Sequence, residues 1–394
     1  MDQIKVLFLT NYYPPEKYPR AIQISHLVQY LRTKISLEVL TFPSEKTGDS
    51  SLLSFTPLNN VLYAKKSKIS MFLEKSRGYF LKKELLLDLG YFLHFDLFKK
   101  AKNLIEPSGI NVIVTFGQPM STHIAGLKLK KKFPHLKWIA HFSDPWVDNN
   151  FNNFNWWLKF INQHYQDRVF GAANELIFTS QETIDLVMRP YPPSISSKAS
   201  CLPHCFNPSL YPNSKKQDKI FQIRYLGNFY GDRQPDSLFK ALKIIPKRAL
   251  KNIQIEFVGS GTKNTIKSYG LERNVITKSS IDYLKSLKLM KESDLLLIID
   301  APAKISPFLP SKLIDYIGAN KPIFGITPQG TSQKLITEMG FLTAPPNNPK
   351  EISEKLFQMI KKMQLTNGLS IPQKIRDKYS IDVVGQKMLD LLTK

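Results

Sequence analysis

Cysteine is scarce in this 394-residue sequence, which contains only Cys201 and Cys205, both in the segment CLPHCF. Two cysteines cannot build a framework of several disulfides, so we expect a protein of a reducing compartment, the cytoplasm. His204 stands beside Cys205, but a structural zinc site needs four ligands and no second pair exists to complete it. We therefore expect two buried thiols and no metal.

Long apolar runs are also absent, because charged residues interrupt the most apolar stretches within about 18 residues. A transmembrane helix needs about 20 consecutive apolar residues, so none is predicted. The N-terminus has an apolar core of only residues 4–9 before polar residues and prolines, which is typical of a first β-strand and not of a signal peptide. The sequence also lacks low-complexity segments, zinc fingers and aromatic RNA-binding motifs.

Acidic residues are few relative to basic ones: 32 Asp and Glu stand against 55 Lys and Arg, a formal net charge of +23. Residues 61–137 contain 15 of the basic and 5 of the acidic residues, a local excess of +10. Concentrated positive charge suggests an anionic partner such as acidic lipid or nucleic acid, although a solvated basic face gives the same pattern.

Within this basic stretch, residues from about 65 to 105 mix lysines and arginines with methionine and aromatic residues. We expect one or two helices that are apolar on one side and basic on the other. Such helices can lie on an anionic membrane surface, or they can cover a sheet while their lysine stems extend along it. Peripheral binding at the cytoplasmic face of the membrane is therefore one expectation.

Apolar segments of strand and helix length alternate along the chain. Strands are expected at 4–9, 35–40, 112–115, 138–140, 175–178, 221–226, 253–258, 295–299 and 323–326. Helices are expected at 21–31, from 121 or 122, and at 156–170, 237–245, 281–290, 311–318, 351–363 and 383–392. Each strand–helix–strand succession is a βαβ unit, so the fold class is α/β with two Rossmann-like parallel sheets.

The chain is long enough for two domains of about 150–200 residues. We predict an N-terminal domain of residues 1–207 and a C-terminal domain of residues 208–375. Residues 376–394 would contain a C-terminal helix that packs back toward the first domain. A Pro- and Ser-rich section ends near residues 207–219, where a hinge is expected, and the cleft between two such domains is a favoured place for ligands.

One stretch, residues 305–326 with the sequence ISPFLPSKLIDYIGANKPIFGI, joins a loop, a helix and a strand. Ser311 stands where a helix N-cap is expected, and Gly318 and Asn320 are expected to close the helix. Ligands of parallel sheets bind beyond the carboxyl ends of the strands. A helix that starts with Ser311 and Lys312 at this edge offers free N–H groups, a dipole end and a cation, which predicts a phosphate or diphosphate site.

With these elements in place, the sequence resembles the retaining glycosyltransferases of family 4 over nearly its whole length. The segments that support the resemblance are KVLFLTNYYPPE, IAHFSDPW, LPHCFNPSLYP, IRYLGNFYGDR and, most specifically, FLPSKLIDYIGANKPIFGI. The resemblance implies the GT-B fold, in which two Rossmann-like domains face a central cleft. It implies transfer of a hexose from a nucleoside-diphosphate sugar to a glycan or lipid-linked acceptor with retention, without a metal, in cell-surface polysaccharide biosynthesis.

The resemblance also implies which residues bind the donor in the C-terminal domain. These candidates are Gly227, Asn228, Arg233, Ser311, Lys312 and Asp315. Lys312 and Arg233 would neutralise the leaving diphosphate, for which preorganised positive charge is required. Asp315 falls where the family has a Glu that hydrogen-bonds the ribose hydroxyls.

Two departures from the family pattern concern these residues. The family often has a second acid in the loop before the helix, and Pro307 occupies that place. The family also often has Arg and Lys after the first strand of the donor domain, where this sequence has Asn228 and Gln234. Arg233 would then substitute for the missing cation, and backbone groups for the missing acid.

On the acceptor side, a polar group should line the site. The catalytic candidates are Asp144 and then His123, with His141 and His204 after them. Asp144 can equally cap the turn before Pro145, and His123 can equally be a surface residue of its helix. Tyr12, Arg20, Gln23 and His141 are the expected acceptor-side contacts.

Two other functions remain open at this point. A nucleotide-sugar 2-epimerase has the same fold, but it needs additional acidic groups around the sugar, and the loop before Ser311 has few of them. A catalytically inactive relative that binds a polyanion or a protein partner is also compatible with the charge of +23.

Overall fold

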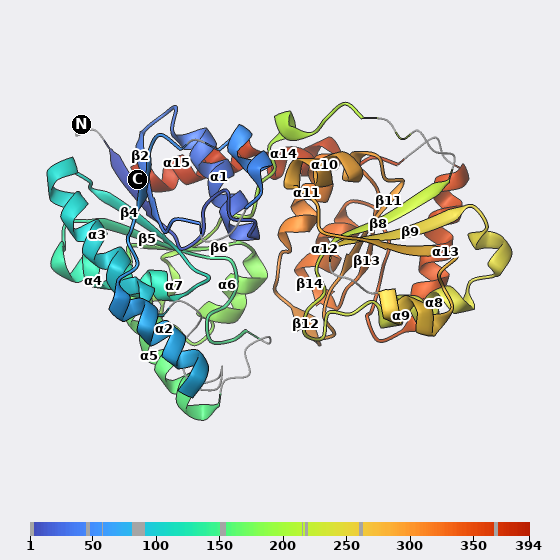
Figure 1. The fold of residues 1–394 in the computed structure, drawn as a ribbon, viewed down its shortest axis with the longest axis horizontal. Helices are drawn as coiled ribbons and strands as arrows, with labels where there is room; N and C mark the ends of the chain where they lie inside the picture. Colours follow the sequence, from blue (N-terminus) through green and yellow to red (C-terminus); the bar gives the residue numbers. More distant parts are fainter. Residues whose placement is uncertain are drawn as a thin grey trace. The chain divides into compact units, whose positions relative to one another are not determined.

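The computed structural model describes residues 4–44, 48–56, 58–80, 91–149, 155–214, 216, 220–259, 263–365 and 369–394. The chain forms two compact units (Figure 1). Unit 1 contains Met1–Pro203 and Val384–Lys394, and unit 2 contains His204–Val383.

Unit 1 is built on a sheet of seven strands in the order β3-β2-β1-β4-β5-β6-β7. The strands are β1 (Lys5–Leu9), β2 (Ser36–Thr41), β3 (Val61–Tyr63), β4 (Val112–Phe116), β5 (Lys137–Phe142), β6 (Glu175–Phe178) and β7 (Ala199–Cys201). The helices are α1 (Pro19–Leu31), α2 (Lys68–Phe80), α3 (Leu93–Ser108), α4 (Ser121–Lys132), α5 (Trp156–Ala172), α6 (Gln181–Met188), α7 (Pro193–Ser196) and most of α15 (Ile381–Thr393). All neighbouring strands pair in parallel, as predicted.

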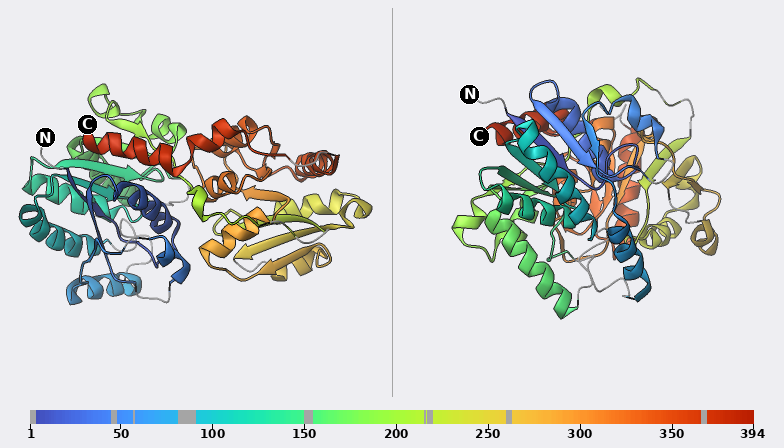
Figure 2. Two further views of the ribbon diagram at one scale, coloured as in Figure 1. Left: turned by 90° about the horizontal axis from the view of Figure 1, so that it is seen from above. Right: turned by 60° about the vertical axis from the view of Figure 1, so that its left-hand side comes forward.

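The two faces of this sheet are covered by different helices. Alternate strand residues such as Leu7 and Trp138 share a core with α3, α4, α5 and α6, as expected from the two-residue period of a strand. On the other face lies α15, whose Leu391 carbonyl accepts a hydrogen bond from Lys137 Nζ at 2.7 Å. Helix α1 lies beside α15 (Figure 2). Tyr30 Oη of α1 donates a hydrogen bond to Gln386 Oε1 of α15 at 2.9 Å.

Unit 2 is built on a second parallel sheet, of six strands in the order β10-β9-β8-β11-β13-β15. The strands are β8 (Phe221–Gly227), β9 (Ile253–Gly259), β10 (Val275–Lys278), β11 (Leu295–Ile299), β13 (Ile323–Ile326) and β15 (Thr343–Ala344), with a separate pair, β12 (Ile305–Ser306) and β14 (Gln329–Gly330). The helices are α8 (Asp236–Ile244), α9 (Lys263–Tyr269), α10 (Tyr283–Lys291), α11 (Ser311–Ala319), α12 (Thr331–Glu338), α13 (Pro349–Leu365) and α14 (Gln373–Lys378). The strand order changes direction between β8 and β11, the kind of switch point where open α/β sheets bind ligands.

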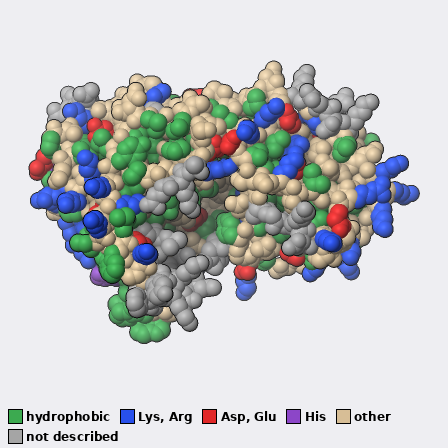
Figure 3. All heavy atoms as spheres, in the orientation of Figure 1, with side chains coloured by type: hydrophobic (Ala, Val, Ile, Leu, Met, Phe, Trp, Pro, Cys, Tyr) green, Lys and Arg blue, Asp and Glu red, His purple; other side chains and the backbone are tan. Residues whose placement is uncertain are grey.

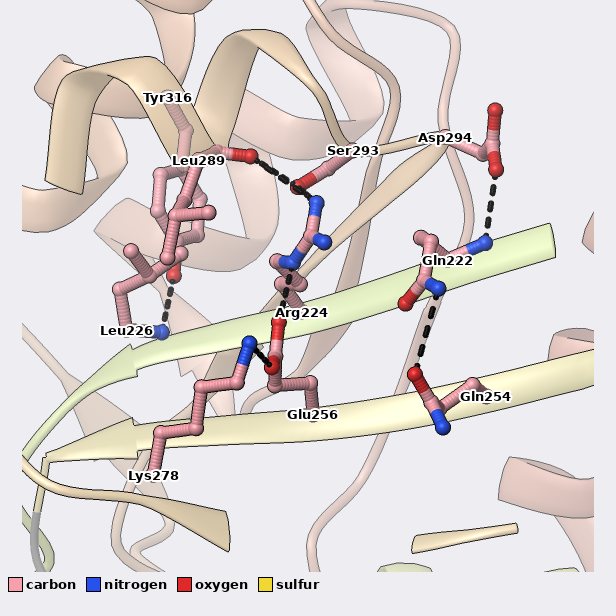
Figure 4. Close-up of polar contacts among 10 residues, drawn as sticks. All are labelled: Gln222, Arg224, Leu226, Gln254, Glu256, Lys278, Leu289, Ser293, Asp294 and Tyr316. Atoms are coloured by element: carbon pink, nitrogen blue, oxygen red, sulfur yellow. Dashed lines mark hydrogen bonds and ion pairs between the residues drawn. The ribbon is translucent and has the colours of Figure 1, made fainter. Parts of the chain in front are cut away.

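A charge network around the buried Glu256 ties the three strands at one side of this sheet together (Figure 4). Arg224 Nε donates to Glu256 Oε2 at 2.5 Å, and Lys278 Nζ lies 2.5 Å from Glu256 Oε1. Arg224 Nη1 also donates to the Leu289 carbonyl of α10 at 3.2 Å and to Ser293 Oγ at 3.3 Å. Burial alone would raise the pKa of Glu256, but hydrogen bonds from Lys278 and Arg224 lower it below its ordinary value.

Several local expectations can be compared with the structure. The basic region forms the two predicted helices, α2 and α3, while residues 81–90 lie outside the described part of the chain. Cys205 is buried, which raises the pKa of its thiol to about 12. The expectation of a buried thiol is wrong for Cys201, which is exposed because it lies on β7, the edge strand of its sheet. No helix in the described part of the chain could span a membrane.

Candidate functional site

The start of α11 differs from the sequence expectation in one detail. Pro310, with φ −62° and ψ 130°, occupies the N-cap position, so Ser311 is the first helical residue and the predicted Ser311 cap is wrong. The ψ of Pro310 is extended whereas Ser311 already belongs to the helix, so the loop ends one residue earlier than predicted. Leu313 N donates to the Pro310 carbonyl at 3.0 Å, and no side chain caps this helix end. The N–H groups of Ser311 and Lys312 belong to the first turn, which has no intrahelical partners.

Lys312 reaches from α11 across the carboxyl end of β8. Its Nζ donates to Tyr225 Oη at 2.7 Å and lies 4.0 Å from the centroid of that ring. Gly227 has φ +136°, and a Cβ there would lie 2.5 Å from Lys312 Nζ. Burial, followed by the charge of Arg233, lowers the pKa of Lys312 to about 7. Glycine at position 227 is therefore required for the ammonium group to occupy this place.

A second glycine completes the edge of the sheet beside Lys312. Gly227 and Gly259 are paired at the ends of β8 and β9. Gly259 has φ +140°, and a Cβ there would lie 2.3 Å from the Gly227 carbonyl oxygen and 3.0 Å from Asn228 Oδ1. The end of β8 can approach the end of β9 this closely because Gly259 lacks a side chain.

Arg233 is the second cation of this edge. Its Nη2 lies 3.5 Å from Asp300 Oδ1, and its Nη1 donates to Tyr230 Oη at 2.9 Å. Asp300 directly follows β11 and is buried; burial raises its pKa, against the effect of Arg233. Asp300 was not predicted as a site residue, although its place directly after a buried strand is a signal for one. Gln234, where the family has a cation, donates instead to the Gly231 carbonyl at 2.9 Å.

Asp315 lies one turn beyond Lys312 on α11, and its polar atoms contact tyrosines. Its Oδ1 accepts a hydrogen bond from Tyr283 Oη at 2.9 Å, and its carbonyl accepts one from Tyr211 Oη at 2.9 Å. Burial raises the pKa of Asp315 to about 7, although the Tyr283 hydrogen bond opposes this. The structure thus groups Lys312 and Arg233 around Tyr225 and Asp300, and places the Asp315 carboxylate against α10.

The backbone of the loop that contains Pro307 is held by a strand pair and by two side-chain hydroxyl groups. Strand β12 pairs with β14, and a Cβ on Gly330, which has φ +132°, would lie 2.0 Å from the Ser306 carbonyl oxygen. Thr331 Oγ1 donates to the Pro307 carbonyl at 2.9 Å, and Ser332 Oγ donates to the Phe308 carbonyl at 3.5 Å. The first turn of α12 therefore fixes the loop that leads into α11.

In unit 1, the acceptor-side candidate Arg20 lies at the carboxyl ends of β4 and β5. Arg20 Nε donates to the Gly117 carbonyl at 3.0 Å, and Nη1 lies 3.2 Å from His141 Nδ1. Because a guanidinium can only donate, His141 Nδ1 is the acceptor. Arg20 Nη2 is buried without a hydrogen-bond partner among the described residues. Burial lowers the pKa of Arg20 to about 10, and the charge of Asp144 opposes this.

Asp144 is half-buried and accepts a hydrogen bond from Gln118 Nε2. Gln118 has φ +63°, a left-handed conformation that strains a residue other than glycine. Such strain is found more often at functional sites than elsewhere. Gln118 is a residue that the sequence analysis missed, since a positive φ leaves no pattern in a single sequence.

His123 lies in the interior of unit 1. Its Nδ1 is 2.7 Å from Thr115 Oγ1, its ring centroid is 4.2 Å from that of Phe142, and its side chain is 0% exposed. Burial holds its pKa well below the ordinary value, so the imidazole is neutral. The alternative of a surface position is wrong. A Cβ on Gly117 would lie 2.7 Å from His123 Nε2, so the β4–α4 loop covers the ring.

The remaining residues predicted for the site are Tyr12, Gln23 and His204. The Tyr12 ring stacks on that of Tyr18 with centroids 4.2 Å apart. Gln23 Oε1 is buried without a hydrogen-bond partner among the described residues. His204 is buried and belongs to unit 2. Among the described residues, no group of three or more His, Cys, Asp and Glu side chains is placed to hold a metal ion.

Known proteins share the fold of this chain. The sequence matches no protein-family model. An uncharacterized glycosyltransferase of Methanocaldococcus jannaschii is 21% identical over 378 residues, 93% of this chain and 91% of that protein. The structure of sucrose-phosphate synthase from Thermosynechococcus elongatus superposes with a TM-score of 0.73 at 13% identity, covering 99% of this chain and 98% of that one.

Two further solved structures share the fold. Anabaena HepE, in complex with UDP and glucose, has a TM-score of 0.68 at 14% identity and covers 99% of this chain and 100% of its own. A structure named as a putative UDP-N-acetylglucosamine 2-epimerase from Listeria monocytogenes has a TM-score of 0.62 at 10% identity. It covers 98% of this chain and 95% of its own. The predicted fold class, two Rossmann-like parallel-sheet units of the GT-B type, is thereby confirmed.

Proposed function

We propose that this protein is a glycosyltransferase that moves a hexose from a nucleoside-diphosphate sugar to a glycan or lipid-linked acceptor, with retention, in cell-surface polysaccharide biosynthesis. Unit 2 binds the nucleotide sugar and unit 1 the acceptor. The protein works in the cytoplasm, at the cytoplasmic face of the membrane.

The observation that supports this proposal most is the group at the carboxyl ends of β8 and β11. Gly227 leaves room for Lys312 Nζ, because a Cβ on residue 227 would lie only 2.5 Å from it. Arg233 lies beside the same edge of the sheet, with its Nη2 3.5 Å from Asp300 Oδ1. Two cations and one buried carboxylate leave net positive charge, to which the first-turn N–H groups of α11 add. Anabaena HepE, which shares the fold, binds UDP and UDP-glucose.

The chemistry follows from this charge. When the bond between the sugar C1 and the phosphate oxygen breaks, the leaving diphosphate gains negative charge, which Lys312 and Arg233 stabilise. For retention, the acceptor hydroxyl attacks C1 from the face that the diphosphate leaves, and its proton passes to a phosphate oxygen. We assign Asp144 to orienting the acceptor hydroxyl, and Arg20 with His141 to binding an acceptor hydroxyl or phosphate.

The test is turnover of nucleotide sugars by the purified protein. We expect release of UDP, GDP or ADP from the matching hexose donor in the presence of a glycan or lipid-linked acceptor. Lys312→Ala should lower this turnover at least about 100-fold, as expected for removing a charge that stabilises the transition state. Lys240→Ala, on the exposed face of α8, is the matched control and should leave turnover unchanged. Equal turnover in both variants would contradict the site.

A 2-epimerase is the second candidate, because enzymes of that name share the fold. NMR of the products separates the two functions. An epimerase gives an inverted C2 in the nucleotide sugar without any acceptor, whereas the transferase proposed here gives a new glycosidic bond. If neither product forms but UDP binds, an inactive relative is the correct description.

A further inference from the structure

The first turns of α5 present an aromatic cluster on the surface of unit 1. The side chains of Trp156 and Phe160 are 79% and 64% exposed, and that of Trp157 is also exposed. The Trp156 and Trp157 rings meet edge to face with centroids 5.7 Å apart, and Trp157 stacks with Phe160 at 6.2 Å. Fully burying one such side chain is worth about 1.5–3 kcal/mol, so leaving three of them in water calls for an explanation.

This exposure is a property of a well-anchored helix. Asn155 caps α5, its side chain accepting a hydrogen bond from Leu158 N at 2.9 Å. Leu158 and Asn162 face inward, and Asn162 Oδ1 accepts from the buried Trp146 Nε1 at 2.7 Å. Asn162 Nδ2 in turn donates to the Leu158 carbonyl at 2.8 Å. With the inner face of α5 fixed in this way, the aromatic cluster necessarily points outward.

Helix α2 presents a second apolar surface of the same kind. Ile69 and Phe72 are 73% and 69% exposed, and Met71 between them is also exposed. The opposite side of α2 is bound to the segment before α3. There, Glu74 Oε1 accepts from Phe92 N at 2.7 Å, and Ser70 Oγ donates to the Phe92 carbonyl at 3.4 Å.

The two apolar surfaces lie on the same part of unit 1. Residue Tyr91, next to the segment that holds α2, contacts α5 through its hydroxyl, which lies 3.2 Å from Tyr165 Oη. In Figure 1 and the right-hand view of Figure 2, α2 and α5 run toward the same end of unit 1. Figure 3 shows hydrophobic side chains at the surface there, with Lys and Arg side chains beside them.

The charges on these two helices are mainly positive. Lys68, Lys75 and Lys159 are exposed on the same two helices. Glu74 is the only acid of α2, and its carboxylate is occupied by the Phe92 amide. Asp167 is the only acid of α5, lies beyond its first two turns, and accepts a hydrogen bond from Tyr191 Oη at 2.6 Å.

We propose that this surface, formed by Ile69, Met71, Phe72, Trp156, Trp157 and Phe160 with its flanking lysines, docks on an anionic lipid bilayer. Tryptophan and phenylalanine are the side chains that insert at the boundary of headgroups and acyl chains, and lysines beside them bind anionic headgroups. Lysines and arginines outnumber the acids on these two helices by five to two, which fits a negatively charged partner. The inference does not depend on the proposed transferase activity.

Tryptophan fluorescence gives a direct readout of this surface. The other two tryptophans, Trp138 and Trp146, are 0% and 2% exposed, so a change on binding reports on Trp156 and Trp157. With vesicles of phosphatidylcholine and phosphatidylglycerol, we expect a blue shift of the emission and quenching by lipids brominated on their acyl chains. Vesicles of phosphatidylcholine alone, or high salt, should weaken binding at least tenfold.

Variants make the test specific. Trp156→Ser with Phe160→Ser should lower vesicle binding in co-sedimentation at least tenfold, and Lys68→Gln with Lys75→Gln should lower it about fivefold for each lysine removed. Leu365→Ser, at an 86% exposed leucine of unit 2, is the control and should bind as the unaltered chain does.

Three results would overturn the proposal. The first is no vesicle binding, and the second is binding that leaves the emission unquenched and survives Trp156→Ser with Phe160→Ser. The third is a concentration-dependent dimer in sedimentation velocity that the same variant abolishes in the absence of vesicle binding, which would make a second copy the occupant.

Discussion

The pKa of Lys312 predicts that diphosphate binding weakens as the pH rises above 7. In the free protein, burial and Arg233 lower this pKa to about 7. A bound diphosphate favours the protonated ammonium and raises the pKa in the complex. The Lys312 contribution to affinity is therefore fully present below pH 7, and it is lost as the pH rises toward the pKa of the complex.

The size of the effect follows from the same pKa. At pH 9, two units above it, only about 1% of free Lys312 is charged, so the affinity could fall up to about 100-fold, or ~2.7 kcal/mol. Lys312 is half-buried, and water screens part of this interaction, so we expect a fall of at least about tenfold. UDP itself is fully ionised above pH 7, because the second phosphate pKa is about 6.

Isothermal titration calorimetry with UDP, in buffers of different ionisation enthalpy, measures the affinity and the number of protons taken up on binding. We expect the uptake of about 0.2 to 0.9 of a proton per UDP bound at pH 8.5, which corresponds to a fall in affinity of about tenfold to 100-fold at pH 9, and little uptake at pH 6. Lys312→Arg, which keeps the charge at every pH, should bind with a flat pH profile between 7 and 9. The reasoning fails if the unaltered protein binds UDP without proton uptake at pH 8.5, or if Lys312→Arg keeps the same pH dependence.

Two further predictions concern the donor-side unit. Gly227→Ala places a Cβ 2.5 Å from Lys312 Nζ, at a backbone φ of +136°. UDP affinity should fall at least about tenfold, and urea denaturation should show a free energy of unfolding that is about 1–3 kcal/mol lower. Unchanged UDP affinity would contradict the assigned position of the Lys312 ammonium. Glu256→Gln removes the carboxylate that two cations share and should destabilise unit 2 by about 3 kcal/mol at pH 7. The pKa of Glu256 is lower in the folded protein than in the unfolded chain. Its contribution to stability is therefore present above the unfolded-state pKa and disappears as the pH falls through the folded-state pKa. A loss of stability in Glu256→Gln that does not depend on pH would show that the charge of Glu256 is not its cause.

The larger elements of the fold could be predicted because their residues are buried in runs of the right length. The strand expected at 221–226 is β8 (Phe221–Gly227), and the one at 295–299 is β11 (Leu295–Ile299). The strands β12 and β14 were not predicted, since each has only two residues and depends on a tertiary contact. That contact is the approach of Gly330 to Ser306, which no local pattern reveals.

The site residues were predictable to different degrees for a similar reason. Lys312 was identified because helix N-termini at strand ends have a local signature. The burial of Arg20 depends on Gly117 and His141, which are 97 and 121 residues away in the sequence. The exposure of Trp156 depends equally on the opposite face of α5, where Trp146 and Asn162 meet. Periodicity places such residues on a helix, but only tertiary contacts decide which face is buried.

The loop before α11 shows how a departure from a family pattern can be compensated. Pro307 supplies neither a carboxylate nor an N–H group, and its carbonyl already accepts a hydrogen bond from Thr331. The diphosphate contacts proposed for Lys312 and Arg233 are made from α11 and from the segment after β8, and not by side chains of this loop. We therefore expect nucleotide binding and sugar recognition to be separable in this chain. Because Gly330 and Thr331 fix the path of the loop, contacts from it to the sugar would come from backbone groups of fixed position, which discriminate hydroxyl geometry without adding charge.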